Sequence, residues 1–325
     1  MKYLSLLFAV LNFATTSFAQ GEWKPLKTGA GGWITGLSVH PTGDPVFARS
    51  DVGGAYRLDP STGQWQQIVT ASSMPAGEVY WNNYLGTLSI TSAPSNSNRA
   101  YLAFNDGIYK SDDQGNHWIK TNLPPMYMAP NDDASKLSGE RLAVDPLNAD
   151  VVYFGSINNG LWRSEDAGQT WTWISSVPSG TPDQGIRQIL FDPSSGSNNG
   201  KTNGIYALVD GHDVFRSTDG GGSWSSSNLN INGIAFLDGE ISDSGQLYVV
   251  GHDEDYTTIG LRHFNGNTWQ QLFTDDNLPM KEIAIDPFDP DRAFIFSNGF
   301  SEIYRTHNLS ASTPSWDYLT LSKSA

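Results

Sequence analysis

Cysteine is absent from the 325-residue sequence, which excludes disulfides, thiolate-ligated metals and a cysteine nucleophile. Basic residues are scarce as well: 19 Lys and Arg stand against 34 Asp and Glu, and the formal net charge is −15. An acidic surface repels phosphate backbones and anionic lipid headgroups, so we expect neither a nucleic-acid partner nor membrane binding. The six histidines show no metal-ligand spacing, and we therefore expect no metal and no cofactor.

Long hydrophobic runs of the kind that cross a membrane are also missing. A short apolar run, residues 4–11, follows Lys2 and precedes the small-x-small sequence Ser17-Phe18-Ala19. This arrangement is typical of a secretory signal peptide. We therefore predict that residues 1–19 are a signal peptide, that residues 20–325 form the mature domain, and that the protein is secreted, either outside the cell or into a periplasm.

A repeated motif is the clearest feature that the sequence does contain. The pattern Ser-x-Asp-x-Gly-x-x-Trp, an Asp-box, occurs at residues 111–118, 164–171 and 217–224, and consecutive copies are 53 residues apart. The Asp carboxylate can accept hydrogen bonds from amides of its own turn, and Gly permits a positive φ. We therefore predict a structural role for the acidic and aromatic residues of the motif, which are Asp113, Asp166, Asp219, Trp118, Trp171 and Trp224.

Degenerate copies of the same frame extend the repeat along the chain. Alternating apolar and polar residues predict strands throughout, and no segment has the periodicity of an amphipathic helix. The sequence thus predicts an all-β fold, a single β-propeller with six recognisable four-stranded units. These units are residues 30–70, 84–122, 138–178, 185–227, 232–273 and 281–321. We interpret residues 194–203 as an inserted loop, and residues 21–26 as an outermost strand that closes the ring.

Strand direction sorts the turns onto two faces. If strands a to d of a unit are antiparallel, the a–b and c–d turns share one face, and the b–c turns and d–a connections share the other. The Asp-boxes are c–d turns, whereas the long connections lie on the opposite face, where we expect function. On that face Asp51 begins a b–c turn, and Trp81, Tyr84 and Tyr127 lie in long connections. By itself an Asp before Gly-Gly is most typical of a turn, and the aromatic rings could either stack on sugars or cover blade edges.

Six segments give these residues a more specific meaning. Residues 31–36 (GGWITG), 48–57 (ARSDVGGAYR), 81–86 (WNNYLG), 138–146 (SGERLAVDP), 191–196 (FDPSSG) and 285–292 (IDPFDPDR) resemble glycoside hydrolase family 74, and the similarity covers nearly the whole mature chain. The resemblance implies a hydrolase that cuts xyloglucan or a related β-1,4-glucan with inversion, in a cleft between two seven-bladed propellers. It also implies that Asp51 is the general base. The candidate substrate-binding residues for the polysaccharide are Arg49, Trp81, Tyr84 and Tyr127.

The sequence also departs from that family. The family's general acid lies on the second propeller, which we expect to be missing here, and six units are recognisable where the family has seven blades. Five aspartates in predicted loops of the same face are candidate acids, although each is by itself typical of a solvated loop: Asp106, Asp132, Asp133, Asp210 and Asp253. A sialidase would need an arginine cluster, and no Arg-Ile-Pro motif is found near the start. A non-catalytic propeller that binds glycan or protein is the alternative to an enzyme.

Overall fold

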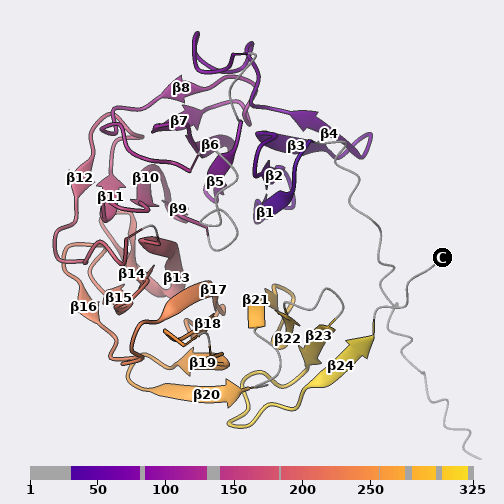
Figure 1. Cartoon of the computed structure of the whole chain (residues 1–325), viewed down its shortest axis with the longest axis vertical. Helices are drawn as coiled ribbons and strands as arrows, with labels where there is room; N and C mark the ends of the chain where they lie inside the picture. Colours follow the sequence, from indigo (N-terminus) through magenta and orange to yellow (C-terminus); the bar gives the residue numbers. More distant parts are fainter. Residues whose placement is uncertain are drawn as a thin grey trace, which may run out of the picture.

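The computed structural model describes residues 31–80, 85–129, 140–182, 184–255, 257–274, 280–297 and 302–320. These residues form an all-β molecule of six four-stranded sheets, which are arranged as blades around a central axis (Figure 1). The architecture is therefore a β-propeller with six blades, which confirms the predicted fold class. Each predicted unit contains one blade, and the predicted outer strand at residues 21–26 lies outside the described residues.

Each blade consists of four consecutive strands, of which the first lies nearest the axis (Figure 1). The strands of blades one to three are β1 (Ile34–Val39), β2 (Val46–Ser50), β3 (Ala55–Asp59), β4 (Gln64–Gln67), β5 (Thr87–Ala93), β6 (Asn96–Phe104), β7 (Gly107–Ser111), β8 (Ile119–Lys120), β9 (Leu142–Asp145), β10 (Asn148–Gly155), β11 (Leu161–Ser164) and β12 (Thr172–Trp173). The strands of blades four to six are β13 (Ile186–Asn198), β14 (Lys201–Val209), β15 (Asp213–Ser217), β16 (Ser225–Ser226), β17 (Ala235–Ile241), β18 (Leu247–His252), β19 (Leu261–Phe264), β20 (Trp269–Phe273), β21 (Met280–Asp286), β22 (Asp289–Ser297), β23 (Glu302–Thr306) and β24 (Asp317–Thr320).

Strand pairing within the blades is antiparallel, so successive turns alternate between the two faces of the propeller. The Asp-box turns join β7 to β8, β11 to β12 and β15 to β16, and they all lie on one face. The turn between β2 and β3, which begins with Asp51, lies on the other face together with the connections between blades. The assignment of turns to two faces is confirmed, and it places Asp51 a strand's length away from the face of the Asp-boxes.

The hydrophobic core is divided among the spaces between neighbouring blades. In β6, for example, Tyr101 and Ala103 pack into the cluster shared with the third blade, while Leu102 and Phe104 pack into the cluster shared with the first. Successive residues of a strand point to opposite faces, so a strand buried on both faces is apolar at consecutive positions. This explains why the middle strands of the blades have continuous apolar runs rather than strict alternation.

Five such clusters are found in the described residues, and each lies between two consecutive blades. None of the five joins the sixth blade to the first. In agreement with this, Leu37 and Val39 of β1 are 49% and 60% exposed, whereas the corresponding strand of the second blade, β5, is almost entirely buried. The first blade therefore has close apolar neighbours on one side only within the described part of the chain.

Residues 194–203 differ from the prediction. They are not a loop, because β13 and β14 continue through them as a long hairpin. Asn199 and Gly200 connect the two strands with φ values of +52° and +73°, the left-handed conformations that a two-residue hairpin turn requires. Pro193 lies within a register shift of β13, and the ladder resumes beyond it. The loop prediction was wrong, and the Asn-Gly pair is the sequence signal that identifies the hairpin.

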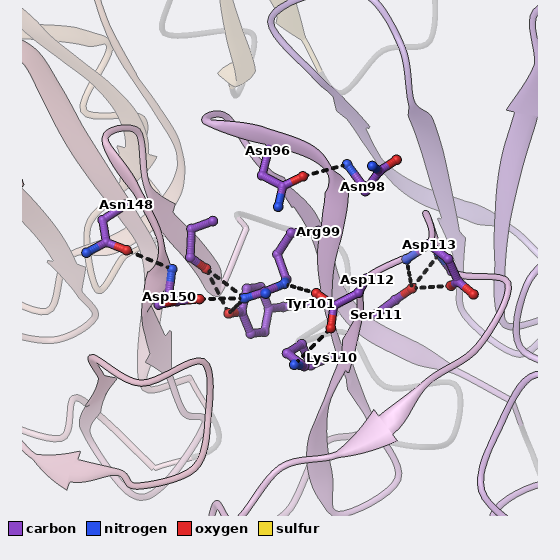
Figure 2. Close-up of polar contacts among 12 residues, drawn as sticks. Asn96, Asn98, Arg99, Tyr101, Lys110, Ser111, Asp112, Asp113, Asn148 and Asp150 are labelled. Carbon is purple, nitrogen blue, oxygen red and sulfur yellow. Dashed lines mark hydrogen bonds and ion pairs between the residues drawn. The ribbon is translucent and has the colours of Figure 1, made fainter.

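Charged side chains join the second and third blades on the Asp-box face (Figure 2). Arg99 of β6 contacts Asp112, which lies within the first Asp-box, and reaches Asp150 of β10 at 2.8 Å. Lys110 lies 3.0 Å from Asp112 and completes the group. Because both carboxylates are solvent-exposed, each pair contributes only about 0–1 kcal/mol to stability. Of these three ion pairs, the one between Arg99 and Asp150 joins the two blades.

Candidate active site

Asp51 lies where β2 ends and the chain turns toward β3. Its Oδ1 accepts hydrogen bonds from the backbone amides of Trp33 at 2.7 Å and Val52 at 2.8 Å. The backbone amide of Asp51 donates in turn to the Trp33 carbonyl at 3.0 Å. The two amides that bind one oxygen fix the direction of the carboxylate. Asp51 is largely buried, with 9% of its surface exposed. A fixed carboxylate near the surface is what a general base requires.

Glycines provide the space for this turn. Gly32 has φ +92°, and a Cβ at this position would lie 2.3 Å from Asp51 Oδ1. A Cβ on Gly53 would lie 1.9 Å from the Gly31 carbonyl oxygen, so neither position accepts a side chain without rearrangement. Ser50 closes the turn, because its hydroxyl donates to the Gly31 carbonyl at 3.0 Å and accepts from the Gly53 amide at 2.8 Å. The glycines on both sides of Asp51 therefore shape the site directly.

Arg49, a predicted substrate-binding residue, is buried beneath this turn with a side-chain exposure of 2%. Its Nε donates to Glu140 Oε1 at 2.9 Å, and its Nη1 donates to the Thr35 hydroxyl at 3.0 Å. The guanidinium thus lies between residues of the first blade and Glu140, which directly precedes the third. A contact between Arg49 and substrate stays a prediction.

Aromatic side chains lie on the same face as Asp51. Tyr127, in the connection between β8 and β9, is 45% exposed. Trp81 and Tyr84, the other two predicted residues, lie outside the described residues. Trp33, which we did not select from the sequence, is 60% exposed; its amide donates to the Asp51 carboxylate, and its carbonyl accepts from the Asp51 amide. Its position in the Gly-Gly-Trp segment was the only available signal, and it adds an exposed indole beside the carboxylate.

The three Asp-box turns share one hydrogen-bond pattern on the opposite face. Each Asp Oδ1 accepts from the hydroxyl of the Ser two residues earlier at 2.8 Å, and from a backbone amide four residues later at 2.8–2.9 Å. The pKa of Asp219 is lowered to about 2, mainly by the hydrogen bond that its carboxylate accepts from the Ser223 amide. These carboxylates are engaged by their own turns, and the residues concerned are Asp113, Asp166 and Asp219.

The candidate acids that the structure describes each have a structural partner. Asp106 lies 2.6 Å from Lys120 Nζ. Asp210 is 1% exposed and accepts a hydrogen bond from Arg187 Nε at 2.5 Å. Asp253 accepts two amide hydrogen bonds within its own turn. Two further candidates, Asp132 and Asp133, lie outside the described residues.

Two other carboxylates, Asp238 and Glu240 of β17, were missed in the sequence. Burial raises the pKa of Asp238 to about 7 and that of Glu240 to about 8, and the charge of Asp238 contributes to the second shift. The Ile283 amide of the sixth blade donates to Asp238 Oδ2 at 3.1 Å. No local motif marks these residues, because their surroundings come from neighbouring blades.

Neither metal ligands nor a membrane-spanning helix are found in the described part of the chain. Its histidines, aspartates and glutamates nowhere gather in a group of three that could hold a metal ion. It also has no helix with the length and apolar character needed to cross a bilayer.

Curated proteins with similar sequences are xyloglucanases. One from Paenibacillus sp is 32% identical over 284 residues, which is 77% of this chain and 27% of that protein. Xyloglucanase Xgh74A of Acetivibrio thermocellus is 34% identical over 251 residues, 69% of this chain and 29% of that protein. The chain thus spans less than a third of the length of these relatives. No protein-family model matches it.

A solved structure extends the similarity to the fold. The crystal structure of the GH74 enzyme from Niastella koreensis matches with a TM-score of 0.77 and 27% identity, over 90% of this chain and 46% of that one. The chain belongs with glycoside hydrolase family 74. The resemblance that the six sequence segments indicated is confirmed. The described family-74 propeller corresponds to slightly less than half of the solved enzyme.

Proposed function

We propose that this chain is the base-bearing propeller of a secreted family-74 glycoside hydrolase that cleaves xyloglucan or a related β-1,4-glucan with inversion. Asp51 accepts a proton from the water molecule that attacks the anomeric carbon. The general acid, which protonates the leaving oxygen, comes from a second propeller that faces this one. In inverting glycosidases the two carboxyl groups lie about 6.5–9.5 Å apart, which leaves room for the water. The exposed aromatic residues of this face bind the glucan, and no cofactor takes part.

The observation that carries this proposal is the environment of the Asp51 carboxylate. An Asp-box aspartate is held by the Ser and the amide of its own turn, which is sufficient to explain it. Asp51 is different, because its Oδ1 is also bound by the amide of Trp33, 18 residues earlier and on the chain entering β1. Two segments therefore converge to direct one carboxylate, on the face opposite the Asp-boxes. Turn formation alone does not require that convergence.

Hydrolysis assays test the proposal. Because an aryl glycoside with a good leaving group needs no general acid, an aryl β-glycoside of a xyloglucan oligosaccharide reports on the base even when only this chain is present. We expect the wild-type chain to release the aryl group, and Asp51→Ala to lower the rate by about 10²–10⁴-fold. Asp255→Ala, an exposed substitution in the corresponding turn of the fifth blade, is the control and should keep the wild-type rate. NMR detection of the first-formed anomer shows whether the configuration is inverted.

Equal release by the wild type and Asp51→Ala would refute the role of Asp51. No release by the wild type would instead favour the second candidate, a non-catalytic propeller that binds glycan. The exposed Tyr127 and Trp33 on the Asp51 face are the observation that supports this alternative. In that case calorimetric titration with the xyloglucan oligosaccharide should show binding that Trp33→Ala weakens.

A further inference from the structure

Glu140 connects the third blade to the Asp51 turn. Its Oε1 accepts a hydrogen bond from Arg49 Nε at 2.9 Å, and its Oε2 accepts one from the Ser89 hydroxyl at 2.6 Å. Arg49 also donates to Thr35 at 3.0 Å. The carboxylate therefore brings together residues of the first and second blades at the point where the chain enters the third.

The residues that follow Glu140 hold it in place. Arg141 is fully buried, and its guanidinium donates to the Ile186 carbonyl at 2.6 Å and to the Gln184 carbonyl at 2.9 Å, where the chain enters the fourth blade. The Leu142 amide donates to the Ser89 hydroxyl at 3.1 Å. Consecutive residues of an extended chain point in opposite directions, which allows Glu140 and Arg141 to bind opposite neighbours. Glu140 is thus anchored independently of its contact with Arg49.

Gly36 on β1 provides the space for the ion pair. A Cβ at this position would lie 2.5 Å from Arg49 Nε and 2.7 Å from Glu140 Oε1. Any side chain at Gly36 would therefore displace the pair. The strand register shifts between Ile34 and Gly36, so this glycine lies at an irregularity of β1 directly beneath the site.

We propose that Glu140 is a positioning residue for Asp51, which acts through Arg49 by fixing the end of β2 that carries the catalytic carboxylate. The inference rests on the proposed function in so far as Asp51 is the base. Arg49 lies two residues before Asp51 and is 2% exposed, and Glu140 is 28% exposed, so their charge-assisted hydrogen bonds form largely away from water. Removing the carboxylate makes the buried guanidinium move toward other acceptors, and β2 moves with it. A displacement of about 1 Å at a reacting group can lower a rate about 10²-fold.

The test compares Glu140→Ala, Glu140→Gln and Gly36→Ala with Asp145→Asn as the matched control. Asp145 lies at the other end of β9, is 1% exposed, and accepts two hydrogen bonds from Thr202 of the fourth blade at 2.8 and 2.9 Å. On the aryl glycoside we expect Glu140→Ala to lower kcat about 10- to 100-fold while KM changes less than about twofold. Glu140→Gln, which keeps an acceptor for Arg49, should recover part of the rate.

Amide hydrogen exchange gives a second measurement that needs no activity. The Trp33 and Val52 amides donate to Asp51 Oδ1, so their exchange reports on how firmly that carboxylate is held. Exchange of both amides should be about 10-fold faster in Glu140→Ala and Gly36→Ala, and unchanged in Asp145→Asn.

These two measurements separate the outcomes. Unchanged kcat and unchanged exchange in Glu140→Ala would overturn the inference, as would equal effects of Asp145→Asn. If the wild type releases nothing from the glycoside while the Glu140 variants accelerate exchange selectively, the positioning role stands and the proposed hydrolytic function fails.

Discussion

Asp238 and Glu240 of β17 are expected to make the folded protein less stable as the pH rises toward 8. Burial raises their pKa values to about 7 and about 8, from ordinary values of 3.8 and 4.5. A carboxyl group with a raised pKa binds more protons in the folded state than in the unfolded state. Its contribution to stability is therefore complete below about pH 4, and it is lost as the pH rises through the folded pKa.

The size of the effect follows from the same linkage. Two such groups lower the free energy of unfolding by at most about 2.7 kcal/mol per pH unit. Because both side chains keep partial contact with solvent, we expect about 1 kcal/mol per pH unit, which is less than half of this limit and amounts to about 2 kcal/mol between pH 6 and pH 8. His263 acts in the opposite direction, since burial lowers its pKa and its contribution grows as the pH rises through the range just below 6.5. His263 is present in both the wild type and the double variant described below, so the difference between their stabilities does not contain its contribution.

The measurement is urea unfolding, followed by tryptophan fluorescence at pH 5, 6, 7 and 8. The double variant Asp238→Asn and Glu240→Gln should flatten the pH dependence and should be more stable than the wild type at pH 8. Asp243→Asn, an exposed substitution in the same blade, serves as the control and should keep the wild-type slope. A double variant with the same slope as the wild type would refute the reasoning, because the two carboxyl groups would then titrate alike in both states.

Three further substitutions have defined outcomes. Gly32→Ala places a Cβ 2.3 Å from the carboxylate oxygen of Asp51, so the rate on the aryl glycoside should fall about 10²-fold; an unchanged rate would mean that this oxygen is not positioned by the turn. Asp113→Ala removes the acceptor of two hydrogen bonds in its Asp-box and the partner of the His117 ring, and thermal unfolding should show a loss of about 1–2 kcal/mol with kcat/KM unchanged. Asp210→Asn removes the charge that faces the buried Arg187, and urea unfolding should show a loss of about 3–5 kcal/mol; a loss below about 1 kcal/mol would contradict the pairing.

Local interactions explain which parts of the fold could be predicted. The hydrogen bonds that the central Asp of an Asp-box accepts lie within one eight-residue motif, as in the bonds of Asp166 to Ser164 and Thr170. The motif is therefore visible in the sequence, and its regular spacing predicts the repeat. Antiparallel pairing then assigns each turn to a face without further information. The hairpin of residues 194–203 was missed although its signal is equally local, because its Asn-Gly turn was interpreted as part of a polar loop.

Contacts between blades could not be predicted in the same way. Glu140 and Arg49 are 91 residues apart, and neither segment has a sequence feature that indicates their contact. The same holds for the Ile283 amide that binds Asp238. The sequence predicted Arg49 as a substrate-binding residue because it adjoins Asp51, whereas the fold shows that its side chain is buried and paired. Position along the chain identifies the sequence neighbours of Asp51, but only the arrangement of the blades shows which of their side chains are buried and which partners they have.

Three of the segments that resemble family 74 meet at one place in the structure. Residues 31–36 contribute Gly32, whose missing side chain leaves room for the carboxylate, and Trp33, whose amide binds it. Residues 48–57 contribute Asp51 itself and the buried Arg49, and residues 138–146 contribute Glu140, which binds Arg49. The resemblance extends over nearly the whole mature chain, so it reflects the propeller fold as well as this turn. Within it, these three segments come from different parts of the chain and meet around one carboxylate, which is the arrangement that the proposed role of Asp51 as general base requires.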